Sequence, residues 1–239
     1  MKFTGEDVPY LTGEQLATVR NFRIANSEKS LPSRRECLVR RVAGKRVIDL
    51  GCTDHVVTID EKIQNGTWLH RHIADAASRC IGFDINSEAV DHVREKHGQR
   101  DIHCYDFFDS PVFPDLLEQH WDYLLMGEML EHIDNPVLML SALRNKYAGL
   151  IDRVILTVPN AFKLSMVKDA LLHRETNNTD HRYCFTPFTL AKVVTRAGLT
   201  VEEFEFCHLD AIPSYGFLKR LVYTRFPAFR NNLLLVARL

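Results

Sequence analysis

Two short apolar segments of this chain each carry an aspartate near their end. Asp49 stands just before Gly51 in residues 46–52 (RVIDLGC), and Asp84 nearly ends residues 81–85 (IGFDI). In an open α/β sheet, ligands bind beyond the carboxyl ends of the strands, where the strand order reverses. A glycine there lets the backbone approach the ligand, and a carboxylate there can accept hydrogen bonds from both hydroxyls of a ribose. The pattern therefore predicts a nucleoside site.

A third aspartate, Asp106, follows the next apolar segment, where it can accept a hydrogen bond from an adenine amino group. Phe107 is the candidate ring neighbour, and Asp49 can order the first loop or face a cationic group of the ligand. A dinucleotide-binding dehydrogenase would carry Gly-x-Gly-x-x-Gly after its first strand, which DLGCTDH does not match. The predicted ligand-binding residues are Asp49, Gly51, Cys52, Asp84, Ile85, Asp106, Phe107 and Gly127.

A second group of reactive side chains lies in the segment GEMLEH, which contains Glu128, Glu131 and His132. If a helical turn forms there, the three side chains share one face. Together with His181 they can bind a divalent cation, and mixed carboxylate and imidazole ligands suit magnesium, manganese or iron(II). Without a metal, His132 or His181 can act as general base, oriented by Glu128 or Glu131. A purely structural alternative is that Glu131 and His132 cap and orient the next helix.

The elements that must position these side chains alternate between strand and helix. Expected strands lie at residues 46–50, 80–85, 102–105, 123–126, 153–158, 200–207 and 232–237. Expected helices lie at 13–24, 33–42, 67–78, 87–97 (with Ser87 as N-cap), 137–147 and 186–198, with a polar loop at 53–66 and an amphipathic stretch at 215–223. This order predicts an α/β fold with one doubly wound, mostly parallel seven-stranded sheet. We expect a single domain over residues 1–239, with an N-terminal helical segment at 1–45 and the catalytic sheet and helices at 46–239.

Composition limits the classes of protein to consider. Of the 239 residues 46% are apolar, which is enough for a core without disulfides or metal staples, and the net charge of −1 gives no sign of a nucleic-acid partner. The six cysteines are scattered without a Cys-x-x-Cys pair, which favours a reducing, cytoplasmic location. No segment approaches the roughly 18 apolar residues of a membrane span. Basic clusters near residues 34–46 and 219–230 can bind a phosphate or form solvated helix faces.

Taken together, these segments resemble the class I S-adenosylmethionine-dependent methyltransferases over roughly residues 46–239. The matching positions are DLG after the first strand, Asp84, Asp106, WDYLLMGEMLEHIDNP at 121–136 and HRYCFTPFTLAKVVTRAGL at 181–199. The segment at 121–136 is similar to that of O-methyltransferases in ubiquinone biosynthesis and of many sugar and small-molecule methyltransferases. The chain departs from the family in the first loop, where Thr53 and His55 replace the second and third glycines, and in the inserted residues 53–66.

The resemblance implies an O-methyltransferase that uses S-adenosylmethionine and acts on a small hydroxylated molecule. A sugar or glycan precursor is the first expectation, and a quinone-like catechol, an RNA 2′-hydroxyl or an inactive binding module are the alternatives. Small-RNA 2′-O-methyltransferases and some ubiquinone-pathway enzymes hold magnesium with a similar Glu-x-x-Glu-His and a distant His, here Glu128, Glu131, His132 and His181. A cation chelated by two adjacent hydroxyls lowers their pKa and orients them, which predicts a vicinal diol or catechol acceptor. A nucleic-acid partner is not expected, because the chain lacks a basic platform with aromatic residues.

Overall fold

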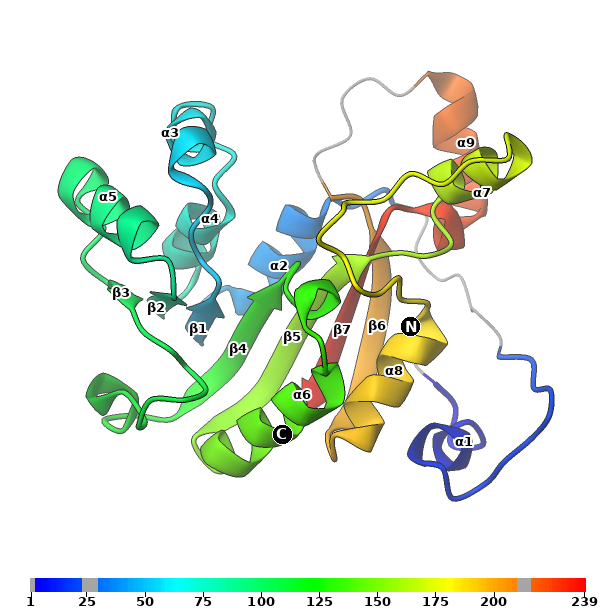
Figure 1. Cartoon of the computed structure of the whole chain (residues 1–239), viewed down its shortest axis with the longest axis horizontal. Helices are drawn as coiled ribbons and strands as arrows, with labels where there is room; N and C mark the ends of the chain where they lie inside the picture. Colours follow the sequence, from blue (N-terminus) through cyan, green and yellow to red (C-terminus); the bar gives the residue numbers. More distant parts are fainter. Residues whose placement is uncertain (1–2, 23–29, 210–215) are drawn as a thin grey trace.

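One sheet of seven strands runs through the computed structural model, which describes residues 3–22, 30–209 and 216–239. Its strand order is β3-β2-β1-β4-β5-β7-β6 (Figure 1). The strands are β1 (Arg46–Leu50), β2 (Arg79–Asp84), β3 (Ile102–Cys104), β4 (Trp121–Gly127), β5 (Ile151–Pro159), β6 (Thr200–Cys207) and β7 (Asn232–Arg238).

The strand order reverses beside β1. The chain moves outward from β1 to β2 and β3, and then returns to place β4 on the other side of β1. Strands β1 to β5 pair in parallel, whereas β7 pairs antiparallel with both β5 and β6. Asp49 lies in register with Gly82 on β2 and with Leu125 on β4, so the three strands end at the same edge of the sheet. The predicted doubly wound, mostly parallel seven-stranded sheet is confirmed.

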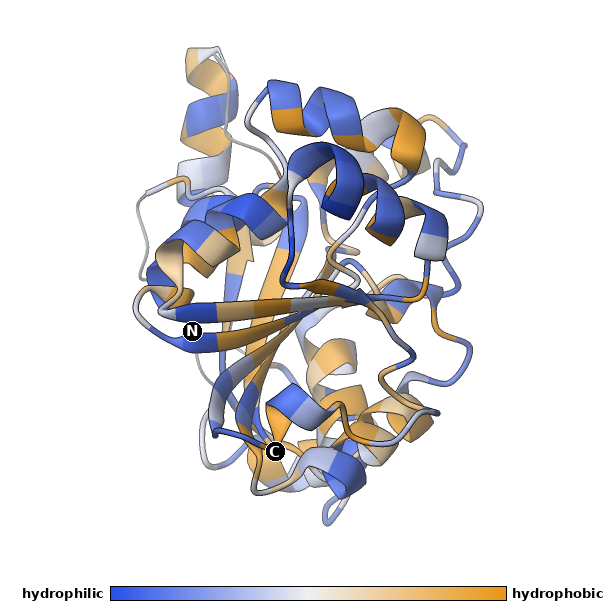
Figure 2. Ribbon diagram, turned by 90° about the vertical axis from the view of Figure 1, so that its left-hand side faces the viewer, coloured by the Kyte–Doolittle hydropathy of each residue, from blue (hydrophilic) through white to orange (hydrophobic). Residues whose placement is uncertain are grey.

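Helices cover both faces of this sheet (Figure 2). They are α1 (Val8–Thr12), α2 (Arg34–Val42), α3 (Val56–Gln64), α4 (Leu69–Ala76), α5 (Ser87–His97), α6 (Pro136–Tyr147), α7 (Leu164–Leu171), α8 (Pro187–Arg196) and α9 (Phe217–Arg225). Short 3-10 turns lie at Pro114–Leu116, Leu130–His132 and Pro227–Phe229. Among the described helices, none combines the length and the apolar character that crossing a lipid bilayer requires.

The alternating side chains of the strands divide the core between the two faces. Ile48 on β1 and Leu124 on β4 belong to the core that contains residues of α6 and α8. Their neighbours Val47 and Leu125 belong to the opposite core, which contains residues of α2 and α4. All four side chains are completely buried. This alternation on central parallel strands explains why their sequences are almost continuously apolar.

Polar residues at helix starts fix where the chain leaves the sheet. The Asn135 side chain accepts a hydrogen bond from the N–H of Leu138 at 3.1 Å, and Pro136 occupies the first turn of α6. Thr186 caps α8 in the same way, as the Thr-Pro pair predicts. The N-cap of α5 is Asn86 instead of the expected Ser87, because the Asn86 side chain accepts from the N–H of Ala89.

Several expected elements differ from the structure. Residues 13–22 are not helical, because Gly13 adopts a left-handed φ of 88° and terminates the preceding helix α1; the rest of the expected helix, 23–24, includes positions outside the described residues. The expected loop at 53–66 contains α3, whose Ile59 is buried under a mostly polar surface. The helix α7 was not expected. Within the amphipathic stretch at 215–223, α9 buries no residue, and residue 215 lies outside the described part of the chain.

Candidate functional site

The first loop after β1 brings the backbone close to the end of β4. Gly51 has a φ of 70°, and a Cβ atom there would lie 2.8 Å from Sδ of Met129. Its N–H donates to the carbonyl of Phe83 on β2 at 2.8 Å. Glycine is therefore required here both by the left-handed backbone and by the close approach. The loop borders a cavity of about 530 Å³, which we name the β1 cavity, and whose lining includes Asp49, Gly51, Cys52, Thr53, Asp84, Gly127, Glu128, Arg34 and Leu209.

Asp49 lies at the inner wall of the β1 cavity. It is 5% exposed, and its Oδ2 atom lies 2.7 Å from Nδ1 of His70, the donor from helix α4. Gly82 makes this pairing sterically feasible, because a Cβ atom at that position would lie 2.9 Å from the His70 ring. Asp49 therefore orders the first loop through α4. His70 also lines the β1 cavity and is therefore part of the site.

Asp84 connects β2 to the same loop. Its Oδ2 atom accepts hydrogen bonds from the N–H and the hydroxyl of Thr53, at 3.1 and 2.7 Å, and Oδ1 accepts from the N–H of Asn86 at 3.0 Å. Thr53 stands at one of the positions where the family usually has glycine, and its hydroxyl gives the loop an anchor that glycine cannot provide. Asp84 still faces the β1 cavity, where its remaining acceptor capacity is available to a ligand.

The other predicted ligand-binding residues lie at different depths. Gly127 and Cys52 line the β1 cavity, and Ile85, directly beyond Asp84, is 76% exposed. Asp106 accepts the N–H groups of Phe108 and Asp109, and the backbone hydrogen bonds hold its pKa below the usual range. Phe107 differs from the expectation of a ring neighbour at the ligand, because it is 1% exposed and stacks on Tyr147 within the core.

Arg34 lines the β1 cavity, although its sequence context indicates only a basic cluster. It lies in the first turn of α2, and its Nη1 atom is 3.6 Å from Oε1 of Glu128. Its Nε atom is buried without a hydrogen-bond partner among the described residues. The neighbouring arginines do not share this position: Arg40 and Arg41 both form ion pairs with Glu205. Arg34 alone of these three therefore brings a positive charge to the β1 cavity.

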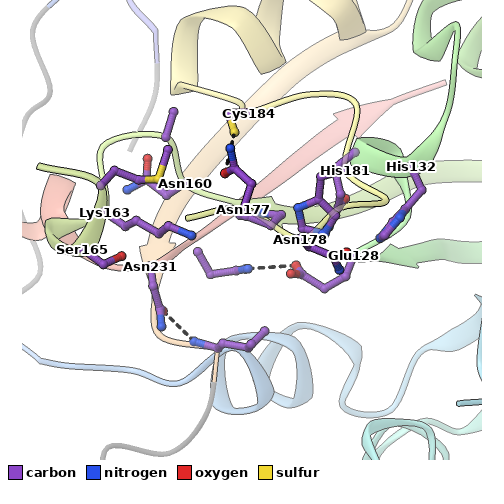
Figure 3. A pocket seen from close by; sticks show the side chains of 16 residues that line it. Glu128, His132, Asn160, Lys163, Ser165, Asn177, Asn178, His181, Cys184 and Asn231 are labelled. Carbon is purple, nitrogen blue, oxygen red and sulfur yellow. Dashed lines mark hydrogen bonds between the residues drawn. The ribbon is translucent and has the colours of Figure 1, made fainter. Parts of the chain in front are cut away.

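A second cavity has a volume of about 460 Å³ and is shown in Figure 3. We name it the histidine cavity. It shares Glu128 and Leu209 with the β1 cavity, so ligands in the two cavities would meet at these residues. Its lining consists of Glu128, Glu131, His132, Pro159, Asn160, Ala161, Lys163, Ser165, Met166, Asn177, Asn178, His181, Cys184, Leu209, Asn231 and Asn232.

Glu131, His132 and His181 form a compact cluster at one side of the histidine cavity. One ligand atom from each lies within 4.8 Å of the others, and the two imidazole rings meet edge to face at 4.6 Å. Nδ1 of His132 is 2.7 Å from Oδ2 of Asp180, which orients that ring. Burial, followed by repulsion from His132, lowers the pKa of His181. His181 is thus held neutral, with a nitrogen lone pair available near neutral pH.

The Glu131 carboxyl group is the most unusual member of the cluster. It is fully buried, and neither oxygen has a hydrogen-bond partner among the described residues. Burial and the nearby Glu128 raise the pKa of Glu131 to about 8. A buried carboxylate without partners is costly and calls for a cation or a proton donor. The donor set of Glu131, His132 and His181 fits a divalent cation such as Mg²⁺ or Mn²⁺.

Glu128 occupies a different position from the other members of the predicted ligand set. Its backbone has a φ of 55°, and the helical turn begins only at Leu130. The expected common face of one helical turn is therefore not formed. Its Oε1 atom accepts a hydrogen bond from Nδ2 of Asn232 at 2.8 Å, which turns the carboxylate toward the junction of the two cavities.

Known proteins share sequence and fold with this chain. Residues 25–203 match a family model described as a methyltransferase domain. A ubiquinone biosynthesis O-methyltransferase of Nitrosospira multiformis is 26% identical over 172 residues, which span 68% of this chain and 66% of that protein, slightly under two thirds of its length.

Two solved structures share the fold. Magnesium protoporphyrin IX methyltransferase from Synechocystis PCC 6803, with S-adenosylhomocysteine bound, has a TM-score of 0.53 and 16% identity, covering 85% of this chain and 81% of that one. The small RNA methyltransferase HEN1 has a TM-score of 0.54 and 15% identity, covering 92% of this chain and 27% of that one.

Proposed function

We propose that this chain, which belongs to the methyltransferase-domain family and uses S-adenosylmethionine, methylates a hydroxyl group of a small, polar acceptor. The proposed acceptor is a sugar or glycan precursor. The observation that carries the proposal is the histidine cavity, whose lining includes five asparagines and two histidines and which shares Glu128 and Leu209 with the β1 cavity. A donor in one cavity and an acceptor in the other would then have their reacting atoms side by side, as direct displacement requires.

In this proposal the β1 cavity holds the methyl donor, which supplies an electrophilic methyl group on a sulfonium sulfur. Asp84, at the end of β2, accepts the ribose hydroxyls, while Gly51 provides close backbone. Arg34 binds the carboxylate of the donor's amino-acid end with its guanidinium group, which has an unpartnered buried N–H among the described residues. Asp49 acts indirectly, since its carboxylate is engaged by His70.

The lining of the histidine cavity favours a sugar over a catechol. Five asparagines, Lys163 and Ser165 face it, and no Phe, Tyr or Trp is among its described lining residues. A flat aromatic acceptor binds best between apolar or aromatic walls, whereas a polyhydroxylated ring matches amide donors and acceptors. An RNA acceptor is disfavoured by the net charge of −1.

The acceptor hydroxyl must lose its proton to attack the methyl group. We propose that Glu131, His132 and His181 hold a divalent cation, which would lower the pKa of the hydroxyl and orient it. The support is the buried, unpartnered carboxylate of Glu131. Without the cation, His181 is the candidate general base, since its lowered pKa keeps it neutral and able to accept the proton.

Calorimetric titration of S-adenosylhomocysteine into chelator-treated protein tests the donor site. Wild type should bind, Asp84→Ala should lose binding, and Glu131→Gln should retain it. Asp84 can act by binding the ligand or by ordering the loop. Thr53→Val distinguishes these roles, because it removes the hydroxyl hydrogen bond to Asp84 but keeps the Asp84 carboxylate. If Asp84→Ala bound normally, the assignment of the β1 cavity would be wrong. If Thr53→Val lost as much affinity as Asp84→Ala, the aspartate would act only by ordering the loop.

Manganese and magnesium titrations of the same proteins test the cation. A heat of metal binding that is measured in wild type and disappears in Glu131→Gln supports a cation that orients the acceptor hydroxyl. Binding of S-adenosylhomocysteine without any response to metal would favour His181 as base. Acceptor class is tested with methyl-labelled S-adenosylmethionine and matched panels of sugars, catechols and short RNAs. Labelling of catechols or RNA but not of any sugar would contradict the proposed acceptor.

A further inference from the structure

The histidine cavity contains a lysine that has no anionic partner among the described residues. The ammonium group of Lys163 has no ion pair or hydrogen bond among the described residues, although the side chain is half-buried. Figure 3 shows it extending into the cavity from the side opposite His132 and His181. A half-buried ammonium group in a cavity is a site for an anion unless a carboxylate of the protein reaches it.

The two carboxylates that line the cavity contact groups other than Lys163. Glu128 accepts from Asn232 and faces Arg34, and Glu131 lies in the cluster with the two histidines. The positive charge of Lys163 is felt within the cavity, since it contributes to lowering the pKa of His181. No carboxylate of the described lining therefore neutralises Lys163.

Further donors near Lys163 also lack acceptors within the described chain. Oδ1 of Asn231 accepts the N–H of Leu209, so the amide NH₂ group of Asn231 remains available. The Ser165 hydroxyl lines the same cavity and has no partner there. One ammonium, one amide and a hydroxyl supply donors in several directions, which suits a group with several anionic oxygens.

We propose that the acceptor carries a phosphate group, which Lys163 binds at the side of the histidine cavity opposite His132 and His181. This inference rests on the proposed function and narrows the acceptor to a phosphorylated or nucleotide-linked sugar. The phosphate anchors one end of the molecule, and the hydroxyl to be methylated then lies at the other end, beside Glu131 and the β1 cavity. A neutral sugar of the same shape would lack the anchor.

Binding of inorganic phosphate to the full chain, measured by calorimetry, tests the site without knowledge of the acceptor. Wild type should bind phosphate, and Lys163→Gln should weaken binding about tenfold or more, the usual effect of losing a charge-assisted hydrogen bond. Lys163→Arg should retain most of the affinity. Lys168→Gln is the matched control, because Lys168 lies on helix α7, which begins directly after Lys163, but is exposed and outside the cavity.

Three results would overturn the proposal: no phosphate binding at millimolar concentrations, equal affinity in Lys163→Gln and wild type, or acetate binding as tightly as phosphate. The last result would assign the site to a carboxylate-bearing acceptor instead. Titration of S-adenosylhomocysteine into the same proteins keeps the two ideas separate. If wild type binds S-adenosylhomocysteine normally but fails to bind phosphate, only the anion site is refuted. If wild type fails to bind S-adenosylhomocysteine, the proposed function itself is refuted.

Discussion

At the scale of single residues, Arg34 offers the most direct test of how the donor is oriented. We expect Arg34→Gln to weaken S-adenosylhomocysteine binding about tenfold or more, because it removes the charged partner of the ligand carboxylate. Methylthioadenosine lacks the amino-acid end, so its affinity should change little. Calorimetry with both ligands measures the difference.

The adjacent residue provides the control for Arg34. Arg35 points to His72 and to the carbonyl of Gly66, outside the β1 cavity, so Arg35→Gln should bind both ligands as wild type does. Equal losses for the two ligands in Arg34→Gln would mean that the substitution disturbs the cavity as a whole, and the assigned role of Arg34 would be wrong.

Residue types at strand ends could be predicted from the sequence, but their environments could not. The expectation that Asp49 and Asp84 lie at a ligand site followed from their positions at the ends of apolar segments, and that for Glu131 followed from its spacing with Glu128 and His132. The partner of Asp49 was not predictable, because His70 comes from a helix 21 residues away in the chain. The burial of Phe107 depends on the distant Tyr147, and the direction of Glu128 depends on a left-handed backbone that its residue type disfavours.

At the scale of elements, helix α3 depends on one carboxylate. Asp60 on α3 accepts Nε2 of His92 and of His97, at 2.8 and 2.7 Å, and the Lys96 ammonium, all from α5. The hydrogen bonds from these three residues hold the pKa of Asp60 well below its usual range. Ile59 is the one buried residue of α3, and Ile63 packs beside it, so this polar cluster adds to a small apolar contact.

We therefore expect Asp60→Asn to loosen α3 locally. Amide hydrogen exchange in residues 56–64 should become about tenfold faster, because an amide cannot replace the ionic hydrogen bonds. Exchange in β4 and β5 should not change. Asp91→Asn, on an exposed position of α5, is the control. Unchanged exchange in α3 would show that the apolar contacts of Ile59 suffice. Because Lys62 of α3 lines the β1 cavity, a looser helix should also weaken S-adenosylhomocysteine binding.

The elements that were not predicted were missed for different physical reasons. Only one apolar side chain of α3 is buried, so its apolar residues do not mark a clear buried face, and side chains of α5 contribute to holding the helix. At the N-terminus the expected helix begins at Gly13, whereas in the structure Gly13 ends the helix α1. Strongly apolar strands such as β5 and capped helices such as α6 were predictable, because burial and capping act locally.

At the scale of the whole molecule, the N-terminal segment is tied to the far end of the sheet. The N–H of His208, just beyond β6, donates to the carbonyl of Pro32 at 3.0 Å, and its carbonyl accepts from the N–H of Arg34. Arg230 also joins these parts, donating to the carbonyls of Phe206 and Ser30. The contact places α2, and with it Arg34, against the β1 cavity, so the fold outside the central strands contributes to the site.

This contact makes global stability dependent on pH. The His208 side chain is 2% exposed and meets the Tyr223 ring edge to face, and burial, with repulsion from Arg230, lowers the pKa of His208 to about 4. The unfolded chain titrates near pH 6.5, so between these values the unfolded state binds more protons and stability falls as the pH falls. The loss is complete below about pH 4.

His208→Phe should remove this pH dependence while keeping a ring against Tyr223. Its melting temperature should fall less than that of wild type between pH 7 and pH 4, and the difference corresponds to at most about 3 kcal/mol. His173→Gln is the control, because His173 is exposed and should follow the wild-type curve. Parallel curves for wild type and His208→Phe would mean that His208 becomes protonated without cost, and that acid destabilisation arises in other groups. If His208→Phe is less stable than wild type at pH 7 but shows the flatter curve, its packing has suffered and the linkage still holds.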